Sequence, residues 1–123
     1  MPKVVVIVDD SDSVAASLAI ALETSLGVRA IVAHHPRAAL SLFEREGGIS
    51  AIVTDLSLPF LDGFELIGAL RRLRSYERLP ALMITAEEHP ESFNTSDDCR
   101  PDVILRKPFS FKEVCRVVSS LLE

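Results

Sequence analysis

The sequence predicts an α/β fold in which a doubly wound parallel sheet carries helices on both faces. Short β-branched apolar runs alternate along the chain with segments whose apolar residues recur at helical spacing. The runs are continuously apolar, which is typical of strands buried on both faces of a parallel sheet. The chain has 123 residues, 48% of them hydrophobic and 25% charged. We therefore expect one compact domain over residues 1–123.

Two strand–helix units are predicted in the N-terminal part of the chain. Val4–Val8 predicts the first strand, and a helix with apolar residues four apart follows it and ends at Gly27. A weaker strand is predicted over residues 28–33. The second helix is expected to begin near Pro36 and to end at the glycine pair 47–48.

The third unit is predicted around a strand at residues 49–54. Asp62 and Gly63 precede a helix that carries its apolar residues on one side. Three arginines near the end of this helix are assigned to its other side: Arg71, Arg72 and Arg74. We interpret them as a solvated surface, since cations are favourable near a helix C-terminus.

Two more strands, at residues 81–84 and 103–105, and a last helix are predicted at the C-terminal end. Apolar residues at helical spacing mark that helix: Phe111, Val114, Cys115, Val118 and Leu121. Between the two strands, residues 87–102 include one aromatic and no aliphatic side chain. We expect an atypical fourth helix here, short or frayed, that begins near Pro90, buries little, and is followed by mobile backbone. A regular but poorly packed helix is the alternative.

Composition argues against several classes of function. The formal net charge of -5 argues against direct binding to nucleic acid or an anionic membrane. Because the apolar runs are far shorter than the ~20 residues of a membrane span, and the N-terminus does not resemble a signal peptide, we expect a cytoplasmic protein. Cys99 and Cys115 are interpreted as free thiols, with Cys115 in the core, and the three histidines as residues that bind no metal.

Polar residues stand where four of the predicted strands end. Asp9 and Asp10 follow the first strand, Asp55 the third, Thr85 the fourth and Lys107 the fifth. The carboxyl ends of parallel strands meet at one edge of the sheet, so we expect these side chains to form one site. Clustered carboxylates need a cation, and Lys107 together with Mg²⁺ would supply it. Such a site suits phosphoryl transfer to a carboxylate nucleophile, with Thr85 as a hydrogen-bond donor.

The chain resembles the receiver domain of bacterial two-component response regulators over essentially its whole length. Five segments carry the resemblance: Val4–Asp10 with Ser11-Asp12, Ile52–Leu56, Leu58–Gly63, Met83–Ala86 and Leu105–Phe109. It implies a flavodoxin-like (βα)5 sheet of strand order 2-1-3-4-5, in which the first and third strands are neighbours.

The resemblance also implies a role for each acidic residue. Asp55 would accept a phosphoryl group from a sensor histidine kinase or a phosphotransfer protein. Asp10, Asp55 and the backbone carbonyl of Ser57 would bind Mg²⁺ directly, and Asp9 would act mainly through water. Ser57 would also lie against the phosphoryl group. The protein would then be a signalling phosphoacceptor that catalyses its own phosphorylation and dephosphorylation, and otherwise no enzyme.

Three further positions match the family's pattern, and one departs from it. Thr85 and the amide of Ala86 would hold phosphoryl oxygens, and Lys107 would pair with Asp55 or with the phosphate. The Lys107-Pro108 bond is expected to be cis. Ile104 departs from the family, which often has an aromatic residue there, so the usual coupling between the hydroxyl and that aromatic is missing or altered.

Three functions remain open on the sequence. The first is a phosphoacceptor that switches contacts with an unknown output protein, as a monomer or a weak phosphorylation-dependent dimer. The second is a pseudo-receiver that binds partners without phosphorylation. The third, a phosphohydrolase of the haloacid-dehalogenase type, is argued against by the adjacent Asp9 and Asp10, although Asp10 and Asp12 have the required spacing. The sequence leaves open whether the domain stands alone or belongs to a longer chain, with Met1 slightly favouring a natural N-terminus.

Overall fold

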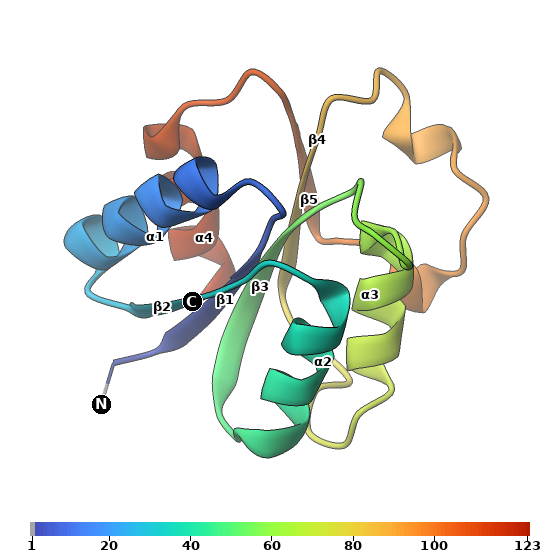
Figure 1. Cartoon of the computed structure of the whole chain (residues 1–123), viewed down its shortest axis with the longest axis horizontal. Coiled ribbons are helices and arrows are strands. Elements are labelled where there is room, and N and C mark those ends of the chain that lie inside the picture. Colours follow the sequence, from blue (N-terminus) through green and yellow to red (C-terminus); the bar gives the residue numbers. More distant parts are fainter. Residues whose placement is uncertain (1) are drawn as a thin grey trace.

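A five-stranded parallel sheet forms the centre of the computed structural model, which describes residues 2–123; Met1 lies outside the described part (Figure 1). The strands are β1 (Val4–Val8), β2 (Arg29–Ala33), β3 (Ile49–Asp55), β4 (Ala81–Thr85) and β5 (Val103–Arg106). All neighbouring pairs are parallel and the order is β2-β1-β3-β4-β5. The predicted flavodoxin-like α/β topology is therefore confirmed.

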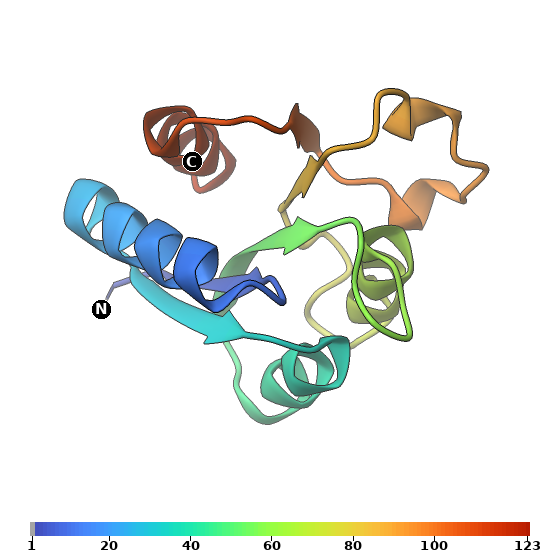
Figure 2. The same ribbon diagram turned by 45° about the horizontal axis from the view of Figure 1, so that its top comes forward.

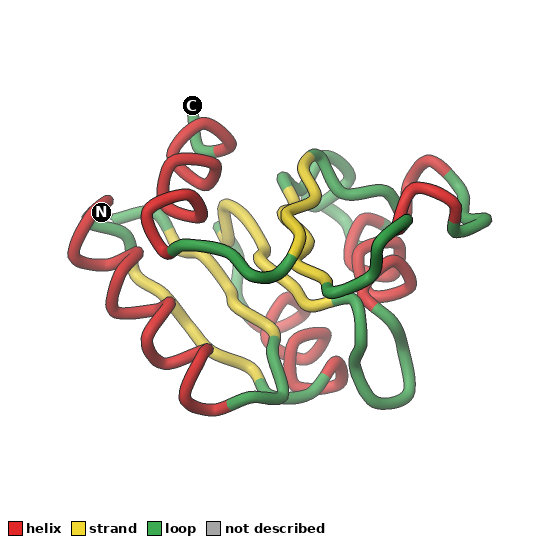
Figure 3. The backbone as a smooth tube through the Cα atoms, turned by 90° about the horizontal axis from the view of Figure 1, so that it is seen from above, coloured by secondary structure: helices red, strands yellow, loops and turns green. Residues whose placement is uncertain are grey.

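Four helices cover the two faces of this sheet. They are α1 (Asp12–Leu26), α2 (Pro36–Arg45), α3 (Gly63–Arg71) and α4 (Phe111–Leu121). Helices α1 and α4 lie on one face, and α2 and α3 on the other (Figures 2 and 3). Within residues 2–123, no helix has both the length and the apolar character needed to span a membrane.

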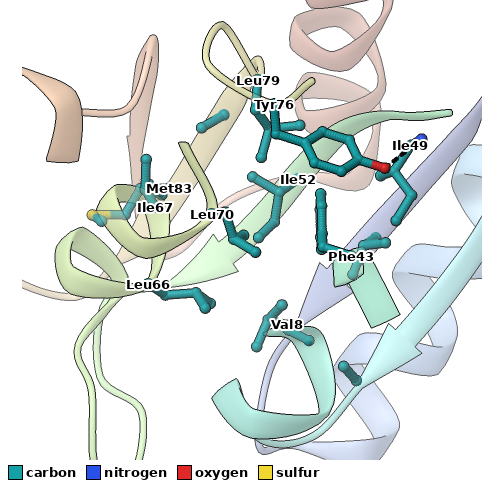
Figure 4. Packing of buried hydrophobic residues seen from close by; sticks show 14 of the residues in the cluster. Val8, Phe43, Ile49, Ile52, Leu66, Ile67, Leu70, Tyr76, Leu79 and Met83 are labelled. Carbon is teal, nitrogen blue, oxygen red and sulfur yellow. Dashed lines mark hydrogen bonds between the residues drawn. The ribbon is translucent and has the colours of Figure 1, made fainter. Parts of the chain in front are cut away.

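The two halves of the core use alternate residues of each strand. Val5 and Ile7 point toward the α1/α4 side, whereas Val6 and Val8 point toward the α2/α3 side. Figure 4 shows the second cluster, where the Tyr76 hydroxyl also accepts a hydrogen bond from the backbone of Ile49 at 3.3 Å. Burial on both faces holds the strands in register, so their carboxyl ends stay aligned at one edge.

Two helix ends follow the predicted signals, whereas α2 ends at Arg45 with Glu46 as its C-cap, before the predicted glycine pair 47–48. Gly27 ends α1 in the left-handed conformation, with φ of 67°. Asp62 caps α3 in a capping box, in which its side chain accepts from the Glu65 backbone and the Glu65 side chain accepts from the Asp62 backbone. Because this cap sets where α3 begins, it also positions the loop that follows Asp55.

Two side chains differ from the sequence-based expectation. Arg71 is not part of a solvated surface: its side chain is 11% exposed and its guanidinium bonds to backbone carbonyls of neighbouring loops. Arg72 and Arg74 are exposed, as expected. Phe111 is 41% exposed at the start of α4, where it lies against Phe109 and not in the core.

Two single turns of 3₁₀ helix, Pro90–Ser92 and Asp97–Cys99, stand in place of a regular fourth helix. The predicted start at Pro90 is confirmed, and the alternative of a regular helix is wrong. The expectation of little burial fails at Cys99, which is buried against α3, and both cysteines are free thiols. The mobility of the backbone after residue 92 stays a prediction.

Ser75 offers a simple test of backbone strain. Its φ is 79°, a conformation that costs an L side chain about 1–2 kcal/mol and costs glycine almost nothing. We expect Ser75→Gly to raise the free energy of unfolding by about 0.5 kcal/mol, after the extra unfolded-state entropy of glycine is subtracted. Urea denaturation measures it. The control is Ser41→Gly inside α2, which should destabilise the protein; a loss of similar size at Ser75 would contradict the expectation.

Candidate functional site

Three carboxylates meet at the carboxyl edge of the sheet. β1 ends at Val8, so Asp9 and Asp10 follow it directly, and Asp55 is the last residue of β3. β1 and β3 are neighbours, with Val8 opposite Thr54. One oxygen from each of the three carboxylates therefore lies within 4.8 Å of the others. The fold brings these residues together as the sequence predicted.

Lys107 brings a positive charge to the same place from the end of β5. Its Nζ lies 3.1 Å from Oδ1 and 3.2 Å from Oδ2 of Asp55. The backbone N–H of Lys107 donates to the Thr85 carbonyl at 2.8 Å, and the Lys107-Pro108 bond is cis, as predicted. The ammonium group is thus held against a carboxylate that is itself buried.

The environment of Asp55 disfavours its charged form. Burial, the largest influence, raises the pKa of the Asp55 carboxyl above its ordinary value of 3.8. The hydrogen bond and the charge of Lys107 act in the opposite direction, and the charges of Asp9 and Asp10 raise the pKa further. A divalent cation beside Asp55 would offset the part of the unfavourable free energy of the charged carboxylate that Lys107 leaves uncompensated.

A cavity of about 380 Å³ opens in front of these charges. It is lined by Asp9, Asp10, Ser11, Val14, Asp55, Lys107, Pro108 and Phe109. The hard oxygen donors suit Mg²⁺, which binds few carboxylates and keeps positions for water and phosphate oxygens. A larger hollow of about 920 Å³ between α1 and α4 contains none of the residues predicted for the site.

Three other predicted residues do not line this cavity: Ser57, Thr85 and Ala86. Thr85 is buried, and its hydroxyl oxygen accepts a hydrogen bond from the backbone N–H of Glu87 at 3.0 Å. Ser57 and Ala86 are exposed. Their assigned roles therefore stay predictions, and Thr85 would have to turn its hydroxyl toward a phosphoryl group.

Gly63 supports the site in a way that the sequence analysis did not identify. Its N–H donates to the Leu56 carbonyl at 2.8 Å. A Cβ placed on Gly63 would lie 2.5 Å from the carbonyl oxygen of Asp55 and 2.9 Å from Cε of Met83. α3 can therefore begin directly beside Asp55 because this residue has no side chain. The Asp62-Gly63 pair was interpreted as the start of a helix and as part of the segment Leu58–Gly63 that carries the resemblance, but not as a position that requires a residue without a side chain.

The contact that His34 makes beside the site was also not predicted from the sequence. Its Nδ1 lies 3.1 Å from the backbone carbonyl oxygen of Asp9 and 3.1 Å from Oδ1 of Asp12. The ring thus links the end of β2 to the loop after β1. The sequence offered no signal for this contact, because it depends on β1 and β2 lying side by side.

Comparisons with known proteins agree with this geometry. The model of the response regulator receiver domain family matches residues 5–119. A 14.6 kDa protein of Leptolyngbya boryana is 36% identical over 93% of this chain and 86% of its own length. The alkaline phosphatase synthesis transcriptional regulatory protein PhoP of Bacillus subtilis is 34% identical over 99% of this chain, which spans about half (49%) of PhoP.

A solved structure is similar over the whole chain. The chemotaxis response regulator CheY4 of Vibrio cholerae superimposes with a TM-score of 0.87 at 27% sequence identity, covering 99% of this chain and 100% of CheY4. The likeness covers 99% of this chain and therefore extends through all five strands.

Proposed function

This chain belongs to the response regulator receiver domain family, and from that premise we propose that Asp55 accepts a phosphoryl group and that its phosphorylation switches protein contacts. The observation that carries the proposal is the Asp55–Lys107 ion pair beside Asp9 and Asp10. The phosphoryl donor would be a sensor histidine kinase or a phosphotransfer protein. The proposed acceptor Asp55, the lysine that neutralises its charge and the two further carboxylates lie together at one edge of the sheet.

The proposed reaction is an in-line transfer to a carboxylate oxygen. An Oδ atom of Asp55 forms a bond to phosphorus while the P–N bond to the donor histidine breaks, and the electron pair of that bond stays on the imidazole nitrogen. Lys107, now 3.1 Å from Asp55, would contact the phosphoryl oxygens and balance their charge. Thr85 and the Ala86 amide would donate hydrogen bonds to the same group, with Ser57 against it.

The proposed cofactor is Mg²⁺. Asp10, Asp55 and the Ser57 carbonyl would hold it directly, and Asp9 through water. When bound, the ion would supply positive charge for the transferred group's oxygens. Asp9, Asp10 and Asp55 provide the donor oxygens within one cluster, and Lys107 keeps Asp55 oriented.

Partners and assembly belong to the same proposal. The output is an unidentified protein and not nucleic acid or a membrane, consistent with the net charge of -5. The protein would act in the cytoplasm, as a monomer or a weak phosphorylation-dependent dimer. Its enzymatic activity would be limited to its own phosphorylation and dephosphorylation.

Intact-mass analysis after incubation with Mg²⁺ and phosphoramidate tests the proposal. We expect one added phosphoryl mass in the wild type, and none in Asp55→Asn or without Mg²⁺, because both remove a part of the acceptor site. Asp97→Asn, an exposed carboxylate elsewhere on the surface, is the matched control and should be phosphorylated like the wild type.

The other outcomes identify the alternatives. An adduct that persists in Asp55→Asn and disappears in Asp10→Asn would favour a phosphohydrolase of the haloacid-dehalogenase type. No adduct, together with no spectral response to beryllofluoride, would favour a pseudo-receiver. Ile104 supports that second candidate, because it packs beside the core where the family often has a switching aromatic residue.

A further inference from the structure

The Arg71 guanidinium joins the end of α3 to two loops. Its Nε and Nη2 donate to the Leu79 carbonyl at 3.1 and 2.9 Å, and Nη2 also donates to Oδ2 of Asp102 at 3.2 Å. Nη1 donates to the carbonyls of Asp98, at 3.2 Å, and Arg100. The Arg71 side chain is 11% exposed, so its charge-assisted bonds to the Leu79 and Arg100 carbonyls lie partly out of water, where such bonds are stronger, whereas the Asp102 carboxylate is 49% exposed.

A second contact holds the same stretch of chain. The Cys99 side chain occupies the space that a side chain at Gly68 would fill, so the turn Asp97–Cys99 packs directly on α3. Asp102 in turn accepts a hydrogen bond from the Ala81 backbone at 2.8 Å. Residues 96–102 are therefore fixed to both α3 and β4, and we call them the anchored part.

Residues 87–95, which we call the movable part, are mostly exposed, and Pro90 is the buried residue among them. The side chains of His89, Glu91 and Ser92 bond within the segment. Phe93 lies against Phe64 of α3, with ring centroids 5.4 Å apart. In Figure 1 this orange segment curves away from β4 before it returns to α3.

One end of the movable part is tied to the candidate site. The Glu87 N–H donates to the hydroxyl oxygen of Thr85, the last residue of β4. A Thr85 side chain that turns toward a phosphoryl group at Asp55 withdraws this acceptor. The first residue of the movable part then loses a bond that holds it in the present conformation.

We infer that Arg71 is a positioning residue that divides residues 87–102 into these two parts, so that a change at Asp55 is passed to residues 87–95 while residues 96–102 stay in place. The response to a change at Asp55 rests on the proposed function, whereas the division itself does not. Lysine could not replace Arg71, because its single ammonium group cannot reach the three loop carbonyls and the Asp102 carboxylate together.

Amide hydrogen exchange of the metal-free protein, measured by mass spectrometry, tests the division. In the wild type, we expect the anchored part, residues 96–102, to exchange at least about tenfold more slowly than the movable part, residues 87–95. Arg71→Lys should remove most of that difference. Arg72→Lys is the matched control, since Arg72 is 67% exposed and its guanidinium forms a single ion pair, with Asp98 at 3.5 Å, that a lysine can also make; it should leave the difference unchanged.

Two results would overturn the division: equal exchange of the two parts in the wild type, or equal effects of Arg71→Lys and Arg72→Lys. Far-UV circular dichroism checks that the variants fold. If Arg71→Lys does not fold, the comparison within the wild type decides, because it requires no substitution.

The same experiment with Mg²⁺ and beryllofluoride separates this inference from the proposed function. We expect changed exchange near Asp55 and in the movable part, residues 87–95, with the anchored part, residues 96–102, unchanged. A change near Asp55 that spreads equally over both parts would overturn the inference. No change near Asp55 would count against the proposed function, and the Arg71 variants would still decide whether the segment is divided.

Discussion

Metal-free Asp55→Asn protein is expected to unfold at a higher temperature than the wild type at neutral pH, and excess Mg²⁺ is expected to reverse that order. The first effect arises because Asp55 is buried and lies near Asp9 and Asp10, so its charged form costs more in the folded than in the unfolded chain. Asparagine keeps the shape and removes the charge. We expect a gain on the order of 1 kcal/mol.

The pH dependence of this difference has a definite sign. The pKa of Asp55 is raised in the folded protein above its ordinary value of 3.8. The stabilisation from a protonated Asp55 is therefore fully present below pH 3.8 and is lost as the pH rises through the folded-state pKa. The Asp55→Asn protein does not undergo this loss of stability. Its melting temperature should therefore exceed that of the wild type only slightly at acidic pH and by more toward neutral pH.

The reversal follows from binding linkage. At a hundredfold excess over its dissociation constant, a ligand that binds the folded state alone adds about 2.7 kcal/mol to stability. The wild type offers three clustered carboxylates to Mg²⁺, whereas Asp55→Asn offers two. Melting temperatures measured across pH, with and without Mg²⁺, test both effects. Asp97→Asn should follow the wild type; a wild type that does not respond to Mg²⁺ would contradict the expectation.

The sequence was sufficient to predict most of the fold and the charged centre of the site. Apolar runs such as Val4–Val8 can form strands buried on both faces, and parallel strands must present their carboxyl ends at one edge. Asp10, Asp55 and Lys107 could therefore be placed together without any contact information. The strand order came from the resemblance, because no local pattern specifies which strands are neighbours.

The rest depended on tertiary contacts that no periodicity contains. Arg71 comes four residues after Ile67, at the border of the apolar side of α3, so its side chain could face either water or a loop that covers the helix. The loop of residues 97–102 covers it, because the carbonyls of this loop accept hydrogen bonds from Arg71 at the helix end. Cys99 is buried for a similar reason: Gly68, on another element, leaves space for its sulfur.

Gly63→Ala is expected to cause the largest loss of stability among the substitutions considered. A methyl group at this position would overlap the Asp55 carbonyl oxygen, and Cε of Met83 and Cα of Leu56 lie 2.9 and 3.1 Å away. A flexible methionine can move, but the backbone of β3 can do so only by shifting Asp55. We expect about 3 kcal/mol of destabilisation, the upper end for overpacking, even though alanine favours a helix over glycine by about 1 kcal/mol.

Gly47→Ala is the matched control, because a Cβ there would meet nothing within 4 Å and the residue has no left-handed φ. Urea denaturation should separate the two variants clearly, and equal stabilities would show that β3 yields easily beside Asp55. Mg²⁺ titration of the folded Gly63→Ala protein gives a second comparison. Because the clash pushes on the backbone of the residue that holds the central carboxylate, the affinity for Mg²⁺ should fall in Gly63→Ala and not in Gly47→Ala.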